Sequence, residues 1–118
     1  MGRVALLFKY DQIRVSTSIM LEIGCPRHVI CMLDRNNRVL YLRASRMHRD
    51  AFPVTVSTYR NSSTGFSICS WKLLRMIRSV MLAGCACDSV RCAHWFPDPV
   101  TIGIRLDEWT PTAREEED

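Results

Sequence analysis

Three cysteines and a histidine lie close together in the pattern Cys85-x-Cys87-x4-Cys92-x-His94. Thiolate and imidazole groups are the ligands that zinc prefers, and four of them complete its tetrahedral shell. The C-x-C pair differs from the common C-x2-C knuckle, in which two thiolates wrap around one ion. The alternative is a loop in which small cysteines pack beneath the neighbouring aromatic side chains. We expect no metal and no cofactor, and we keep the zinc site as the less favoured alternative.

Residues for covalent or acid–base catalysis do not form a recognisable set. A nucleophilic thiol or hydroxyl needs a base beside it, and the sequence pairs no such group with a particular histidine. No Gly-rich phosphate-binding loop is present. The acidic residues are few and fall mostly in expected turns or in the C-terminal segment. The sequence therefore predicts a protein that is not an enzyme.

Positive charge is concentrated in the first half of the chain and is carried almost entirely by arginine. Residues 1–60 hold ten Lys/Arg and four Asp/Glu, a net charge of +6, whereas residues 61–118 hold six and eight, a net charge of −2. Arginine binds phosphate through two parallel hydrogen bonds and stacks on bases, so this half fits nucleic acid. The alternative is an ordinary solvated surface rich in arginine. The candidate DNA-binding residues are Arg14, Arg35, Arg38, Arg43, Arg46 and Arg49.

The stretch from residue 12 to residue 43 is expected to position most of these arginines. Alternating apolar and polar residues at 12–16 predict a half-buried strand. The hydroxyl residues that follow are good N-caps. Ile19 and Ile23 have the i, i+4 spacing of a short helix, and Gly24 suits the left-handed position that ends it.

A hairpin is expected next. The continuous apolar run at 29–33 predicts a strand buried on both faces, and residues 39–42 predict its partner. The polar turn at 34–38 is expected to take its positive φ from an asparagine. Two candidate arginines would then lie in the turn, and the basic segment 43–50 is expected to form a loop.

The rest of the chain is expected to add further strands and one long helix. Apolar spacing predicts a helix from Trp71 to Leu82, with a buried stripe formed by Leu73, Met76, Ile77 and Val80. Segment 85–99 is expected to be irregular. Further strands are expected at 4–8, 53–59, 66–68 and 100–106. The sequence therefore predicts an α+β fold: a mainly antiparallel β-barrel-like sheet with one long and one short helix.

The order of strand, short helix ending in glycine and hairpin resembles the swapped-hairpin domain of the AbrB, MazE and SpoVT group of DNA-binding regulators. Val15 and Ser16 stand where that family has Ile-Pro. Ile19, Ile23 and Gly24 match its apolar-x-x-x-Leu-Gly pattern. The resemblance covers roughly the first third of the chain.

The sequence also departs from that family at its basic positions. Met20 stands where the family has an arginine in the helix, and Gln12 stands where it has an arginine in the strand. Arg27-His28 takes the place of the family's Gly-Asp before the hairpin. The resemblance implies a dimeric or pseudo-dimeric β-barrel that binds duplex DNA through basic side chains and regulates transcription.

An internal repeat at an offset of 53 aligns residues 15–21 with residues 68–74. In both, a short strand passes through hydroxyl residues into a helix, although such junctions are alike in many proteins. We expect one globular domain over residues 1–109. If the repeat is real, half-barrels at 4–50 and 51–109 would resemble the tandem arrangement of MraZ-type proteins. Residues 110–118 are expected to form a disordered acidic tail.

The predicted function is that of a small cytoplasmic DNA-binding protein. No apolar run approaches the length of about 18–20 residues needed to span a membrane, and no secretory signal is recognisable. The alternative is a non-enzymatic protein-interaction module, such as an antitoxin or a mobile-element accessory protein. The expected partners are double-stranded DNA, a second copy of the chain or another protein, but no membrane.

Overall fold

The structure is a computed structural model that describes residues 2–46, 49–59, 63–81 and 87–111. Within these residues the chain forms nine strands, two α-helices and one 3-10 helix. The helices are η1 (Phe8–Tyr10), α1 (Thr17–Glu22) and α2 (Trp71–Val80). The strands are β1 (Val4–Leu7), β2 (Gln12–Ser16), β3 (His28–Asp34), β4 (Val39–Ser45), β5 (Phe52–Pro53), β6 (Thr55–Tyr59), β7 (Ser63–Cys69), β8 (Ser89–Asp98) and β9 (Thr101–Pro111).

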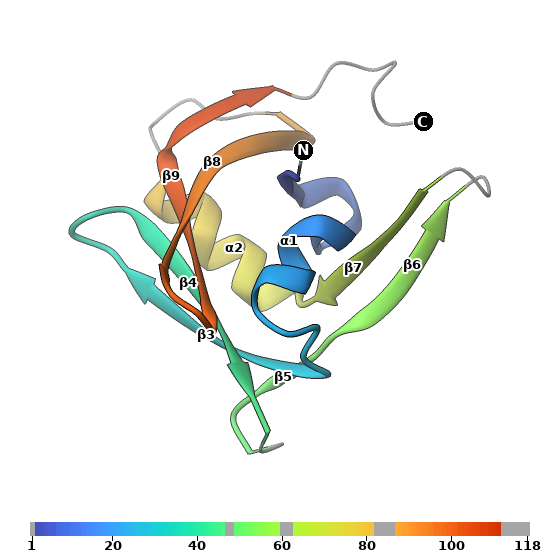
Figure 1. The fold of residues 1–118 in the computed structure, drawn as a ribbon. Coiled ribbons are helices and arrows are strands. Elements are labelled where there is room, and N and C mark those ends of the chain that lie inside the picture. Colours follow the sequence, from blue (N-terminus) through green and yellow to red (C-terminus); the bar gives the residue numbers. More distant parts are fainter. Residues whose placement is uncertain (1, 47–48, 60–62, 82–86, 112–118) are drawn as a thin grey trace.

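The strands form one antiparallel sheet in the order β5-β3-β4-β9-β8-β1-β2-β7-β6. Its two ends, β5 and β6, follow one another in sequence with Val54 alone between them. The sheet therefore curls back on itself into a nearly closed barrel, which Figure 1 shows as a ring of strands. The predicted α+β fold, a barrel-like antiparallel sheet with one long and one short helix, is confirmed.

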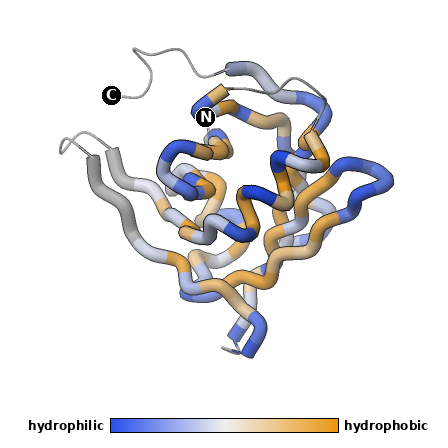
Figure 2. The backbone as a smooth tube through the Cα atoms, turned by 180° about the vertical axis from the view of Figure 1, so that it is seen from behind, coloured by the Kyte–Doolittle hydropathy of each residue, from blue (hydrophilic) through white to orange (hydrophobic). Residues whose placement is uncertain are grey.

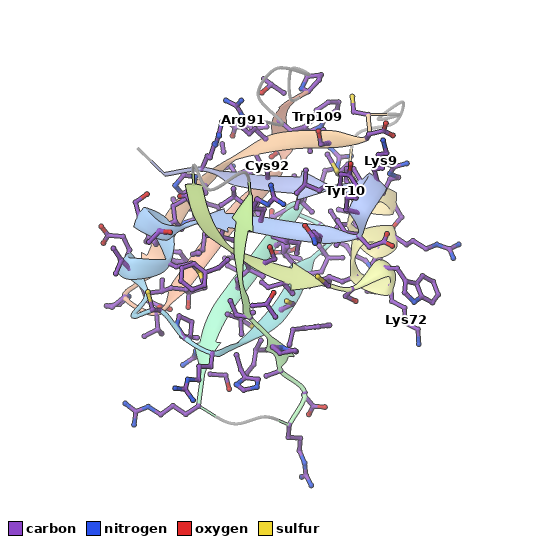
Figure 3. The ribbon with its side chains drawn as sticks, turned by 90° about the vertical axis from the view of Figure 1, so that its right-hand side faces the viewer. Lys9, Tyr10, Lys72, Arg91, Cys92 and Trp109 are labelled. Carbon is purple, nitrogen blue, oxygen red and sulfur yellow. The ribbon has the colours of Figure 1, made fainter. Side chains whose placement is uncertain are left out.

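The two helices, α1 and α2, cover opposite ends of the barrel (Figure 3), each with its apolar side turned toward the core. In the view of Figure 1 both overlie the middle of the ring of strands. Ile19 and Met20 of α1 and Leu74 and Ile77 of α2 are almost fully buried, together with the inward-facing residues of the strands. In Figure 2 the hydrophobic positions follow the strands and helices, while the β3–β4 turn is hydrophilic. Burial of these apolar side chains is the main force that holds the barrel together.

Helix α1 ends as the sequence predicts but begins differently. Gly24 adopts a positive φ of 87°. Its N–H donates to the Leu21 carbonyl and the N–H of Cys25 donates to the Met20 carbonyl, which is the Schellman pattern. At the other end the Ser16 hydroxyl does not cap the helix, because it accepts a hydrogen bond from the Arg3 backbone N–H at 3.0 Å.

Helix α2 is shorter than predicted, and three of its four predicted core residues, Leu73, Ile77 and Val80, are buried. Ser70 caps it, since its hydroxyl accepts from the Leu73 N–H at 3.2 Å. The helix ends at Val80 rather than at residue 82. Met76 was predicted in the buried stripe, but it is 44% exposed, and Leu74 takes its place in the core. The buried stripe therefore keeps the i, i+3, i+4 spacing, with Leu74 in place of Met76.

The hairpin formed by β3 and β4 differs from the prediction in two ways. Strand β3 is buried on one face only, because Val29 is fully buried while Met32 is 43% exposed. No second layer covers its outer side among the described residues. The positive φ of the turn falls on Arg38, at 54°, rather than on an asparagine. Asn37 instead donates from its backbone and its side chain to the Asp34 carboxylate.

The C-terminal part contains more strand than predicted. Segment 85–99 was expected to be irregular, yet residues 89–98 form β8, which pairs with both β1 and β9. Strand β9 continues to Pro111, so residues 110 and 111 belong to the sheet rather than to a tail. The first strand ends at Leu7 rather than at residue 8, and η1 begins at Phe8. Long-range pairing stabilises β8, and its sequence alone carries no clear alternation.

Two parts of the chain share the order strand, helix, hairpin. Strand β2 leads through Ser16 into α1 and the β3–β4 hairpin, and β7 leads through Ser70 into α2 and the β8–β9 hairpin. Strands β2 and β7 pair with each other, and Arg14 lies opposite Ser67, which is the residue 53 positions further along. The tandem origin of the two units stays a prediction.

Candidate nucleic-acid interface

The β3–β4 hairpin carries three of the six predicted DNA-binding residues. On β4, Leu40 and Leu42 point into the core while Arg43 is exposed on the outer face. Arg35 and Arg38 lie in the turn, and both are exposed. The Arg38 carbonyl accepts a hydrogen bond of 2.8 Å from the Leu106 N–H, which fixes the turn to β9.

Two further arginines follow β4. Arg46 and Arg49 are exposed, and residues 47 and 48 between them lie outside the described part of the chain. We call the exposed arginines of this region the hairpin surface. From Arg38 to Arg46 the chain runs for eight residues, or about 26 Å at the rise of a β-strand. The members of the hairpin surface are Arg35, Arg38, Arg43, Arg46 and Arg49.

Arg14 does not lie with the other candidates. It is half-buried on the outer face of β2, between Ala5 of β1 and Ser67 of β7. Strands β9, β8 and β1 separate β2 from β4 in the sheet. Its guanidinium donates to the Gln12 side-chain oxygen at 3.5 Å. The structure therefore gathers five of the six predicted arginines and places the sixth on another wall of the barrel.

An aromatic row crosses the outer face of the sheet beside Arg43. Met32, Tyr41, Gly103 and Trp95 lie directly opposite one another on β3, β4, β9 and β8. The rings of Tyr41 and Trp95 meet edge to face, with centroids 5.9 Å apart. The Arg105 guanidinium lies 5.1 Å from the Trp95 ring. This row packs two aromatic rings and one cation against each other on the outer face.

Two carboxylates beside this surface have their own partners. Asp98 accepts hydrogen bonds from the Val100 N–H at 2.9 Å and from the Thr101 hydroxyl at 3.0 Å. Those bonds, with a smaller contribution from the charge of Arg43, lower the pKa of Asp98 below its ordinary value. The pKa of Asp34 is lowered by its hydrogen bonds from Asn37. Both carboxylates are therefore ionised at neutral pH, and Asp98 offsets part of the positive field around Arg43.

The candidate zinc ligands do not converge in the described part of the chain. Cys85 lies outside the described residues. Cys92 is buried and His94 is half-buried on the same strand, β8. The His94 ring packs edge to face against Phe96, and burial lowers the pKa of His94. Among the described residues, no group of three His, Cys, Asp or Glu side chains is placed to hold a metal ion.

A second basic surface was missed in the sequence. Lys72, Arg75 and Arg78 project from α2 and are exposed, as is Lys9 of η1. Aromatic rings lie beside each of these cations: Trp71 beside Lys72 and Arg75, Tyr10 beside Lys9, and Phe8 beside Arg78. The three-residue spacing of the cations after Trp71 was visible in the sequence. Their joining with η1 was not, because it depends on the pairing of β2 with β7.

Comparison with protein-family models, with curated proteins and with solved structures finds no significant match for this chain. No helix in the described ranges is long and apolar enough to cross a membrane. The two basic surfaces are therefore the features of the molecule that bear on its function.

Proposed function

We propose that the protein binds duplex DNA through the hairpin surface and acts as a small transcriptional regulator. The observation that carries this proposal is the alignment of exposed arginines along one hairpin, from the turn through β4 to the segment beyond it. Within the described residues none of these five arginines forms an ion pair with a carboxylate. Their guanidinium groups are therefore available to phosphates without breaking an existing pair.

The turn end of the hairpin supports contact with a groove. From Ile30 to Asp34, strand β3 pairs only with β4 among the described residues, and the turn projects from the barrel in Figure 1. A two-stranded β-ribbon fits the major groove, which is about 12 Å wide. Arg35 and Arg38 would then lie closest to the DNA. Arg43 and Arg46 would contact phosphates further along, where contacts set position rather than sequence.

A double substitution tests this proposal. Arg43→Ala with Arg46→Ala should weaken binding to a duplex by about 1–3 kcal/mol in total, the usual scale for such contacts. Fluorescence anisotropy with a labelled duplex at two salt concentrations measures it. Arg3→Ala is the control, because Arg3 is exposed beside β1 and outside the hairpin surface. Unchanged affinity in the double variant would remove the basis for the hairpin surface.

A charge-preserving variant separates the effect of positive charge from the effect of the guanidinium's hydrogen-bond geometry. Arg43→Lys with Arg46→Lys keeps both positive charges but loses bidentate hydrogen bonding. An intermediate affinity is expected. If the wild-type protein binds no duplex at low salt, the proposal fails, and the protein-interaction alternative takes its place. A cytoplasmic location belongs to the same proposal, because a regulator must reach the DNA.

A further inference from the structure

Helix α2 and the 3-10 helix η1 form one continuous basic and aromatic surface, which we call the helix surface. The Asp11 carbonyl, just after η1, accepts a hydrogen bond of 3.0 Å from the N–H of Ser70, just before α2. The Arg78 guanidinium of α2 lies 4.2 Å from the centre of the Phe8 ring of η1, so a side-chain contact also connects the two helices. Figure 3 shows Lys9, Tyr10 and Lys72 along the side of the molecule where α2 lies.

The charges on α2 are all of one sign. Residues 71–80 contain Lys72, Arg75 and Arg78 and no acidic residue. From residue 72 to residue 78 the helix rises about 9 Å, at 1.5 Å per residue. Successive phosphates of one DNA strand advance about 3.4 Å along the duplex axis. Lys72 and Arg75, about 4.5 Å apart along that rise, are therefore spaced for neighbouring phosphates of one strand.

Aromatic rings hold these cations in place. The Lys72 ammonium and the Arg75 guanidinium lie 5.8 Å and 5.5 Å from the Trp71 ring, and the Lys9 ammonium lies 5.7 Å from the Tyr10 ring. Both rings are largely solvent-exposed, at 52% for Trp71 and 61% for Tyr10. Cations held over rings lose less side-chain freedom on binding an anion than free side chains do. The helix surface is thus preorganised for a polyanion.

The same geometry argues against a membrane. An amphipathic helix that binds a bilayer buries its apolar face among the acyl chains. On α2 that face is already used, because Leu73, Leu74 and Ile77 are buried in the barrel core. The exposed apolar side chains of α2 are Met76 and Trp71, and two cations of the helix lie over the Trp71 ring.

A protein partner is also a poorer fit. Protein interfaces draw most of their energy from aromatic or arginine anchors buried in pockets of the partner. Here Trp71 and Tyr10 have cations over their rings, so burying them would require the partner to desolvate those charges as well.

We propose that the helix surface binds the sugar-phosphate backbone of nucleic acid independently of base sequence, as a second contact beside the hairpin surface. This inference rests on the proposed DNA-binding function, and it places a second DNA contact on η1 and α2, away from the β3–β4 hairpin. Phosphates pair with Lys72, Arg75 and Lys9, while Arg78 supports the surface by stacking on Phe8 and donating to the Cys87 carbonyl at 2.9 Å. Such contacts add affinity and salt dependence without sequence information.

The test uses a helix double variant that carries both Lys72→Ala and Arg75→Ala. Its binding to one labelled duplex of arbitrary sequence is compared with that of the wild-type protein and of the hairpin double variant, Arg43→Ala with Arg46→Ala. The slope of log K against log salt should become shallower by about 2, because each lost phosphate contact removes about 0.9 from it. Affinity at low salt should fall by about tenfold, on the scale of two phosphate contacts. Met76→Ala is the matched control on the same helix face, since it removes no charge and should leave the slope unchanged.

The outcomes separate this inference from the proposed function. A wild-type slope and affinity in the helix variant, with loss in the hairpin variant, overturn the inference alone. Loss in the helix variant with no loss in the hairpin variant supports the inference and removes the hairpin surface. Stronger binding to phosphatidylserine vesicles than to duplex at the same salt, lost in the helix variant, also overturns the inference. Unchanged thermal unfolding monitored by circular dichroism establishes that each variant is folded.

Discussion

Trp95 of β8 lies flat against the backbone of Gly103 on β9, so closely that a Cβ added at Gly103 would sit 2.6 Å from the indole ring. The same ring meets Tyr41 edge to face and carries Arg105 beside it. The absent side chain at position 103 is therefore what allows the aromatic row to lie on the outer face of the sheet.

Gly103→Ala should destabilise the protein by about 1–3 kcal/mol, the usual cost of overpacking, because the Trp95 ring must leave its place. Chemical denaturation measures the change. In a Trp95→Ala background the same substitution should cost much less, since nothing then occupies the space. Equal costs in the two backgrounds would contradict this assignment.

Asp98→Asn should tighten binding to duplex DNA. The amide oxygen can still accept from the Val100 N–H, and the Thr101 hydroxyl must turn to accept from the amide NH2, while the negative charge near Arg43 is removed. We expect a gain of a few-fold at low salt that shrinks as salt screens the field. Glu22→Gln on α1 removes the same charge away from the hairpin and should change affinity less. An equal gain in both variants would point to net charge instead.

The thiol of Cys31 should resist modification in the folded protein. Burial raises the pKa of Cys31 from its ordinary value of 9.0 to about 12. Iodoacetamide labelling at pH 8 with mass spectrometry should therefore modify the exposed Cys25 and Cys69 well before Cys31. Rapid labelling of Cys31 without unfolding would contradict its placement on the core side of β3.

The same shift predicts a loss of stability in alkali. The pKa of Cys31 is higher in the folded state than in the unfolded state, so the folded state keeps the thiol proton to higher pH. The contribution of Cys31 to the free energy of unfolding is therefore fully present below about pH 9 and is lost as pH rises toward 12. Denaturation curves between pH 8 and pH 11 measure this loss. Cys31→Val should lessen it, whereas Cys25→Ala should leave it unchanged.

Ser70→Ala should lower the free energy of unfolding by about 1 kcal/mol, the usual cost of losing an N-cap. Its hydroxyl accepts from the Leu73 N–H, one of the otherwise unpaired donors at the start of α2. Ser18→Ala is the control, because that hydroxyl is exposed and bonds only to the Ser16 hydroxyl among the described residues. Equal effects of the two substitutions would exclude a capping role for Ser70.

Local patterns in the sequence determined the secondary structure well where each pattern has a local cause. Ser70 and Gly24 marked the start of α2 and the end of α1, because caps and left-handed residues act within a few positions. Alternation at Ile102, Ile104 and Leu106 marked β9, and all three are fully buried. The exposed arginines of the β3–β4 hairpin also followed from their place in a polar turn and beyond a strand.

The tertiary structure decided which of those elements meet. Strand β8 showed no alternation of its own, and pairing with β1 and β9 stabilises it. The exposure of Met76, the separation of Arg14 from the hairpin and the contact of Trp95 with Gly103 depend on partners far away in sequence. Short stretches of sequence contain the hydrophobic periodicity and the capping residues of an element, whereas strand order and register depend on how the whole core is filled. The sequence by itself therefore determined the charge and the elements that have local signals, and only the folded barrel formed β8 and decided which arginines and aromatic rings share a surface.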